Sequence, residues 1–159
     1  MGFALSSMTV TSPAFGQGAA IPAGHTGEGE DISPKLSWSD APEGTRSFAV
    51  VCHDPDAPLI TPQGTYGFVH WVLYNIPAGE SALAQGTDQY TNGKNDFGNE
   101  GYGGPMPPNG HGKHQYYFWV LALDQELELE GGLSMGALLA KIEPNVIGMN
   151  RLVGVYERD

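Results

Sequence analysis

Residues 95–124 read NDFGNEGYGGPMPPNGHGKHQYYFWVLALD, and the chain is organised around this stretch. Its first half is rich in glycine and proline, whereas residues 115–124 form an apolar run rich in aromatic side chains. Glycine permits positive φ and proline fixes φ at about −65°, so such a loop follows a tightly prescribed path. We interpret the stretch as a constrained loop that delivers His114 and Tyr116 to a fixed place at the start of a strand. The alternative is a long surface connection with incidental histidines.

The composition is typical of short strands joined by turns. The 159 residues include 23 glycines and 12 prolines, and this length suits a single domain, residues 1–159, around one core. The formal net charge of −11 makes nucleic acid and anionic membrane surfaces poor partners. Cys52 is the only cysteine, so no intrachain disulfide forms, and its apolar neighbours predict a buried, inert thiol. The stretch MGFALSSMTV at residues 1–10 has neither a basic region nor a long apolar core, and no apolar span follows, so we expect a cytoplasmic protein without stable membrane insertion.

Apolar runs of strand length recur along the chain and predict an all-β fold. Strands are expected at residues 8–11, 36–38, 47–53, 68–76, 116–123, 126–130 and 151–156. The run SFAVVCH at 47–53 indicates a strand buried on both faces, and ELELE at 126–130 alternates as an edge strand does. A helix is expected after Ser134, with one helical turn near residues 81–84. About seven short strands and one or two short helices predict a β-sandwich with Greek-key connections.

Four polar residues lie within or at the ends of otherwise apolar strands, and they are Asp54, His70, His114 and Tyr116. Three separate strands supply them, so we expect them to converge at one end of a sandwich. A buried imidazole needs a partner for each ring nitrogen, and a carboxylate can provide one and fix the tautomer. Two such histidines and a tyrosine hydroxyl would present hydrogen-bond donors to an anion, phosphate above all, with backbone N–H groups of residues 104–112 adding to them. The alternative is that His70 is satisfied within the core.

Other kinds of site are less well supported by the residues. The spacing His111-x-x-His114 occurs in metal sites, but no further ligand pair accompanies it, so no metal is expected. A serine hydrolase would need the G-x-S-x-G motif, which does not occur. GYGG at 101–104 is not the dinucleotide fingerprint. No cofactor and no catalytic residue is therefore predicted.

Several motifs in order resemble those of the phosphatidylethanolamine-binding protein family. They are HDPDAP at 53–58, HWVLYNIP at 70–77, NDFG at 95–98, GYGGP at 101–105, PP at 107–108 and GKH at 112–114. The resemblance covers nearly the whole chain and is closest to the bacterial and archaeal Raf-kinase-inhibitor-like branch. SP at 33–34, LSW at 36–38 and LVGVY at 152–156 also match that branch.

The resemblance implies a Greek-key β-sandwich with a small anion-binding pocket at one end. The pocket residues that carry over by motif are Asp54, Phe68, His70, Pro107, His114 and Tyr116. Asp56 is expected to brace its own loop. The resemblance also implies inhibition of protein kinases or proteases. The long C-terminal helix of the animal branch is missing, and the apolar surface left near the pocket predicts a two-fold homodimer.

We therefore expect a non-enzymatic binding protein that accepts a phosphate or carboxylate head group. At least one of His70 and His114 is expected to donate to the anion as an imidazolium, so that binding weakens as the pH rises. The alternative is a hydrolase or isomerase in which one of these histidines acts as general base and Asp54 orients it. A third hypothesis is an interaction protein with a vestigial pocket.

Overall fold

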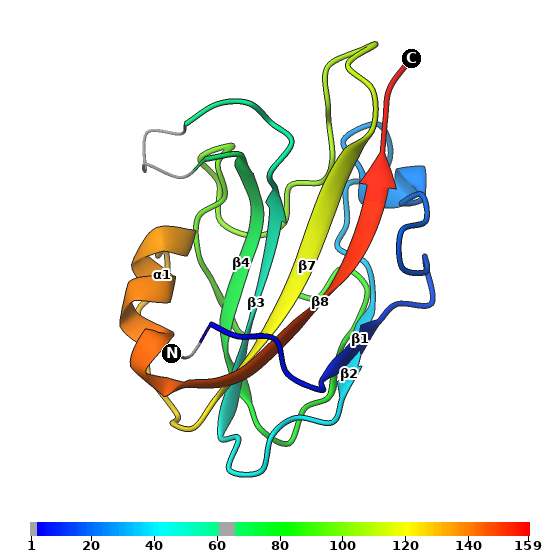
Figure 1. The fold of residues 1–159 in the computed structure, drawn as a ribbon. Coiled ribbons are helices and arrows are strands. Elements are labelled where there is room, and N and C mark those ends of the chain that lie inside the picture. Colours follow the sequence, from blue (N-terminus) through cyan, green and yellow to red (C-terminus); the bar gives the residue numbers. More distant parts are fainter. Residues whose placement is uncertain (1–2, 61–65) are drawn as a thin grey trace.

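The computed structural model describes residues 3–60 and 66–159 and contains two antiparallel sheets and one α-helix (Figure 1). The larger sheet has the order β6-β4-β3-β7-β8, and the smaller sheet has the order β1-β2-β5. The strands are β1 (Thr9–Thr11), β2 (Leu36–Ser39), β3 (Ser47–Asp54), β4 (Phe68–Pro77), β5 (Ala82–Leu83), β6 (Thr91–Asn92), β7 (His114–Leu123) and β8 (Val146–Tyr156). The helices are α1 (Met135–Ile142) and the 3-10 turns η1 (Ala23–His25) and η2 (Glu143–Asn145). The predicted β-sandwich is confirmed.

The larger sheet lies between the smaller sheet and helix α1 (Figure 1). Strand β3 is its centre, and β7 returns to lie beside β3 only after the chain has passed through β4, β5 and β6. This long return gives the Greek-key connection that was expected. Within the described ranges, no helix is long and apolar enough to cross a membrane.

Both faces of β3 are buried, as its continuous apolar sequence predicted. Phe48, Val50 and Cys52 point into the core between the two sheets. Ala49 and Val51 point into a second core beneath helix α1. The central strand is thus covered on both faces. Polar groups can therefore gather at its end, where β3 stops at Asp54.

Helix α1 begins as predicted, at the N-cap residue Ser134. The Ser134 hydroxyl accepts a hydrogen bond from the Ala137 N–H at 3.1 Å, which satisfies one of the unpaired donors of the first turn. Leu138 and Ile142 lie one helical turn apart and are fully buried against the sheet. The apolar stripe therefore fixes which face of the helix packs.

Two local predictions were wrong. Residues 126–130 do not form a strand, because the side chain of Asn75 binds both the N–H and the carbonyl of Leu129 and so takes the place of a ladder partner. The expected helical turn near residues 81–84 contains strand β5 instead. Leu83 pairs with Leu36 and is buried between the sheets, so tertiary packing overrides the local preference.

Asn75 offers a test of this tethering. Its φ is +59°, and its side chain donates to Thr91 Oγ1 and to the Leu129 carbonyl, both at 2.9 Å. We expect Asn75→Ala to lower the free energy of unfolding in urea by about 2 kcal/mol, because partly buried hydrogen-bond partners lose their bonds. Asn75→Gly loses the same bonds but tolerates positive φ, so it should be roughly 1 kcal/mol less damaging. Equal midpoints for wild type and Asn75→Ala would contradict this account.

Candidate functional site

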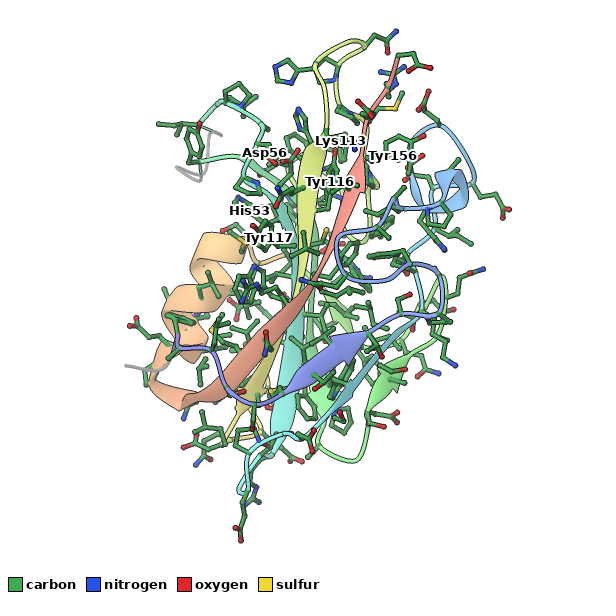
Figure 2. All side chains as sticks on the ribbon, turned by 45° about the vertical axis from the view of Figure 1, so that its right-hand side comes forward. His53, Asp56, Lys113, Tyr116, Tyr117 and Tyr156 are labelled. Atoms are coloured by element: carbon green, nitrogen blue, oxygen red, sulfur yellow. The ribbon has the colours of Figure 1, made fainter. Side chains whose placement is uncertain are left out.

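A cavity of about 320 Å³ opens at the end of the larger sheet where β3 stops and β4 and β7 begin. All six predicted site residues line it, namely Asp54, Phe68, His70, Pro107, His114 and Tyr116. Their role in binding stays a prediction, but their convergence is a feature of the structure. Figure 2 shows Tyr116 at this end of the sheet, with Asp56 and Tyr156 nearby.

A wider groove of about 520 Å³ lies elsewhere, between Asn75 and residues 126–130. The side-chain amide of Asn75 lines this groove and is already hydrogen bonded to Thr91 and Leu129. The charged residues of the groove are three glutamates. No histidine lines it among the described residues. The smaller cavity holds three histidines and the unpaired hydroxyl of Tyr116, so it is the candidate site.

Strand pairing places the site residues on one face of the sheet. Asp54 pairs with Phe68 across β3 and β4, and β7 lies on the other side of β3. His114 and Tyr116 are two residues apart on β7, so both side chains point to the same face. The site is thus assembled from three adjacent strands.

A register shift in β4 brings His70 to the same face. His53 pairs with Val69 whereas Cys52 pairs with Trp71, so His70 is one extra residue in β4. A β-bulge of this kind re-aims a side chain. Consequently Trp71 packs in the core between the sheets while its neighbour His70 lines the cavity. Strict alternation of side chains along a strand would place His70 and Trp71 on opposite faces, so it does not predict this arrangement.

Asp54 is the buried anchor of the site, with 3% of its surface exposed. Its Oδ2 accepts a hydrogen bond from His114 Nδ1–H at 2.7 Å, and its Oδ1 accepts one from the Asp56 N–H at 2.8 Å. The Asp56 carboxylate in turn accepts the N–H of Gln115 at 2.7 Å. Asp56 was expected to brace its own loop. Through its bond to Gln115 it also braces the start of β7.

His111 extends this chain of hydrogen bonds from the loop before β7. Its Nδ1 lies 2.7 Å from Nε2 of His114, so one ring donates and the other accepts. The spacing of this pair had been interpreted only in terms of metal ligands, and His111 was not among the predicted site residues. Because His111 Nδ1 and His114 Nε2 are hydrogen bonded to each other, neither nitrogen is available to a metal ion. Within residues 3–60 and 66–159, no group of three or more His, Cys, Asp or Glu side chains is arranged to hold a metal ion.

His70 is buried and its tautomer is fixed. Its Nδ1 lies 2.6 Å from the carbonyl oxygen of Gly103, which can only accept, so Nδ1 carries the proton. Burial lowers the pKa of His70 from 6.5 to about 4, although the Gly103 carbonyl and the charge of Asp54 oppose the shift. The ring is therefore neutral at pH 7, and Nε2 has a free lone pair. Of the two histidines expected to donate to an anion, His70 therefore does not do so as an imidazolium at pH 7, and the expectation for His114 stays a prediction.

Tyr116 has a fully buried side chain, and its hydroxyl has no hydrogen-bond partner among the described residues. Its ring meets that of His70 edge to face, with centroids 5.2 Å apart. Burial, followed by the charge of Asp54, raises the pKa of the phenol, so the hydroxyl remains a donor. An unpaired buried hydroxyl is costly, and Tyr116 is one of the residues that line the cavity.

The loop over the cavity is shaped by side-chain hydrogen bonds. Asn95 Oδ1 accepts the N–H groups of Phe97 and Asn99, and Asp31 Oδ1 accepts the N–H of Gly104 at 2.7 Å. A Cβ atom on Gly104 would lie 2.4 Å from the carbonyl oxygen of His25, so only glycine fits there. These contacts hold the Gly103 carbonyl in place against His70.

Three apolar residues at the mouth were not among the predicted site residues. Leu59, Phe97 and Met106 line the cavity and are exposed by 46%, 47% and 42%, respectively. Phe97 also packs edge to face on Phe68, with centroids 4.7 Å apart. They lie in loops, where no periodic pattern marks a side chain as part of a site.

The model of the phosphatidylethanolamine-binding protein family matches residues 11–157 of the chain. The chain belongs to this family. A UPF0098 protein of Aquifex aeolicus is 42% identical over 159 residues, covering 96% of this chain and 90% of that relative. Escherichia coli YbcL, whose crystal structure is titled a new member of the mammalian PEBP family, is 34% identical with a TM-score of 0.87, covering 97% of this chain and 100% of YbcL. The recognised resemblance is thereby confirmed.

A more distant likeness shows the fold alone. The carboxypeptidase Y inhibitor, solved in complex with its cognate proteinase, is 18% identical with a TM-score of 0.58. The match covers 96% of this chain and 83% of the inhibitor.

The neutral, buried His70 predicts an acid-sensitive site in this family member. Between pH 6.5 and about 4 the unfolded chain binds a proton at this position and the folded chain does not, so stability falls as the pH falls through this range. The full effect is about 3 kcal/mol. Urea unfolding of wild type and His70→Gln across this range should show a difference that shrinks towards acid pH. A constant difference would contradict the assignment.

Proposed function

We propose that this chain is a non-enzymatic binding protein whose cavity accepts the phosphate or carboxylate head group of a small ligand. The observation that carries the proposal is the Tyr116 hydroxyl, which is buried in the cavity wall without a partner among the described residues. Leaving such a group unpaired costs about 1–3 kcal/mol. A ligand oxygen in the cavity would accept its hydrogen bond and remove this cost.

The size and surroundings of the cavity also support a small ligand. About 320 Å³ is at the lower end of the range for ligand sites, roughly 300–1,000 Å³. The polar groups lie deep, on β3, β4 and β7, and the apolar Leu59, Phe97 and Met106 lie at the mouth. This arrangement suits a polar head group that carries an apolar substituent.

An enzyme that uses the same residues is the second candidate. The free Nε2 of His70 faces the cavity as a base, which favours a hydrolase or isomerase. A pKa of about 4 makes it a weak base, however, and the described lining contains no serine, threonine, cysteine or lysine as nucleophile. Turnover of phosphate or carboxylate esters that is lost in His70→Ala would favour the enzyme.

A protein kinase or protease is the macromolecular partner that we propose. The carboxypeptidase Y inhibitor, which shares the fold, was solved together with its proteinase. Exposed apolar side chains at the cavity mouth, including Leu59 and Phe97, supply surface for such a partner or for a second copy of the chain. Sedimentation at several concentrations separates a homodimer from a monomer.

Binding of inorganic phosphate tests the proposed site. We expect Tyr116→Phe and His114→Ala each to weaken phosphate binding about tenfold or more in calorimetry, because each removes a polar contact or its support. Tyr117→Phe is the matched control, since the Tyr117 hydroxyl bonds to Gln115 Oε1 and does not line the cavity. Phosphate that binds the Tyr116→Phe variant as tightly as wild type would refute the role of the buried hydroxyl.

A further inference from the structure

The polar atoms that face the cavity are mostly hydrogen-bond acceptors. No lysine or arginine lines the cavity among the described residues, and residues 61–65, TPQGT, include none. The polar lining consists of Asp54, His70, His111, His114 and Tyr116. A fully ionised anion needs donors, so the donor capacity of these five side chains limits which ligands they can hold.

His70 presents an acceptor to the cavity. Its single proton lies on Nδ1 and is donated to the Gly103 carbonyl at 2.6 Å, and this carbonyl cannot donate in return. Nε2 is the ring nitrogen left for a ligand. It can form a hydrogen bond only with a group that brings its own proton.

Asp54 adds negative charge and further acceptor capacity to the same wall. Each of its oxygens receives one hydrogen bond, from His114 and from the Asp56 N–H, and each retains a second lone pair. A carboxylate in a buried wall repels a fully ionised anion but accepts a hydrogen bond from an acidic hydroxyl.

The two remaining histidines do not alter this balance while both are neutral. His114 Nδ1–H is donated to Asp54, so its Nε2 must accept from His111 Nδ1–H. Nε2 of His111 then also becomes an acceptor. Tyr116 is left as the one side-chain donor of the lining, through its hydroxyl.

We propose that the cavity selects phosphate monoesters in their hydrogen-phosphate form. The P–OH group donates to Nε2 of His70, and the Tyr116 hydroxyl donates to a second phosphate oxygen. The ester substituent lies against the apolar mouth formed by Leu59, Phe97 and Met106. This inference rests on the proposed function, since it specifies the ligand of the same cavity.

Sulfate monoesters and phosphodiesters are the discriminating comparison. Both have the tetrahedral shape of a phosphate monoester, but at neutral pH neither carries a hydroxyl proton to donate. The second ionisation of a phosphate monoester lies near pH 6, so at pH 7.5 most of the ligand must gain a proton to bind. Binding should therefore take up close to one proton and strengthen as the pH falls from about 8 to 6.

Other titratable groups surround His70 and belong to the same proton balance. They are His53 and Asp54 of β3, His114 and Tyr116 of β7, and Asp96 and His111 of the loops. Proton uptake by any of these protein groups would serve sulfate and phosphate alike. Discrimination between the two esters, and not proton uptake alone, therefore identifies the hydrogen-phosphate form.

The experiment is calorimetry of the wild-type protein at pH 7.5 with phenyl phosphate, phenyl sulfate and methyl phenyl phosphate. Two buffers of different ionisation enthalpy give the number of protons taken up. We expect phenyl phosphate to bind at least about tenfold more tightly than the other two, with uptake of close to one proton. Inorganic phosphate should bind less tightly than phenyl phosphate, because it lacks the apolar substituent.

Variants assign the effect to single groups. His70→Ala should abolish the preference for phenyl phosphate over phenyl sulfate, whereas Tyr116→Phe should weaken both by similar factors. Tyr117→Phe should match wild type. Equal affinity for phenyl phosphate and phenyl sulfate, or a preference that survives His70→Ala, would overturn this inference and leave the proposed function standing. Failure of all four ligands to bind the folded wild-type protein would overturn the phosphate head group in the proposed function itself.

Discussion

The hydrogen bond between Asp54 and His114 is the interaction on which the rest of the site depends. A carboxylate with 3% exposure is stable only when its oxygens are paired, and His114 Nδ1 and the Asp56 N–H supply the pairing. The bond joins the end of β3 to the start of β7. A second hydrogen bond, between His114 and His111, fixes the loop before β7 in the same way. One buried charge thus fixes the relative positions of two strands and a loop at the cavity.

The sequence was sufficient for the fold and for the main residues of the cavity wall. The continuous apolar run of β3 and the capped apolar stripe of α1 each have one stable arrangement, so pattern and structure agree. Asp54 and His114 could be singled out because polar groups at the ends of buried strands must find partners, and strand ends meet at a sheet edge.

The parts that the sequence did not predict arise from long-range contacts. The Asn75 side chain replaces a strand partner for residues 126–130, a contact across 54 residues with no local signature. The protonation of His70 depends on the Gly103 carbonyl and on burial, which no spacing reveals. Exposed apolar side chains in loops, such as Leu59 and Phe97, can be recognised as part of the cavity only from the structure, because no pattern in the sequence marks them.

The extra residue in β4 separates the requirements of the site from those of the core. Without it, alternation would allow only one of His70 and Trp71 to face the space between the sheets, and chemistry would compete with packing for that position. With the extra residue, both side chains face this side of the sheet. Trp71 packs in the core between the sheets, and His70 lines the cavity. A substitution at position 70 would therefore alter the wall of the cavity and leave Trp71 in place between the two sheets.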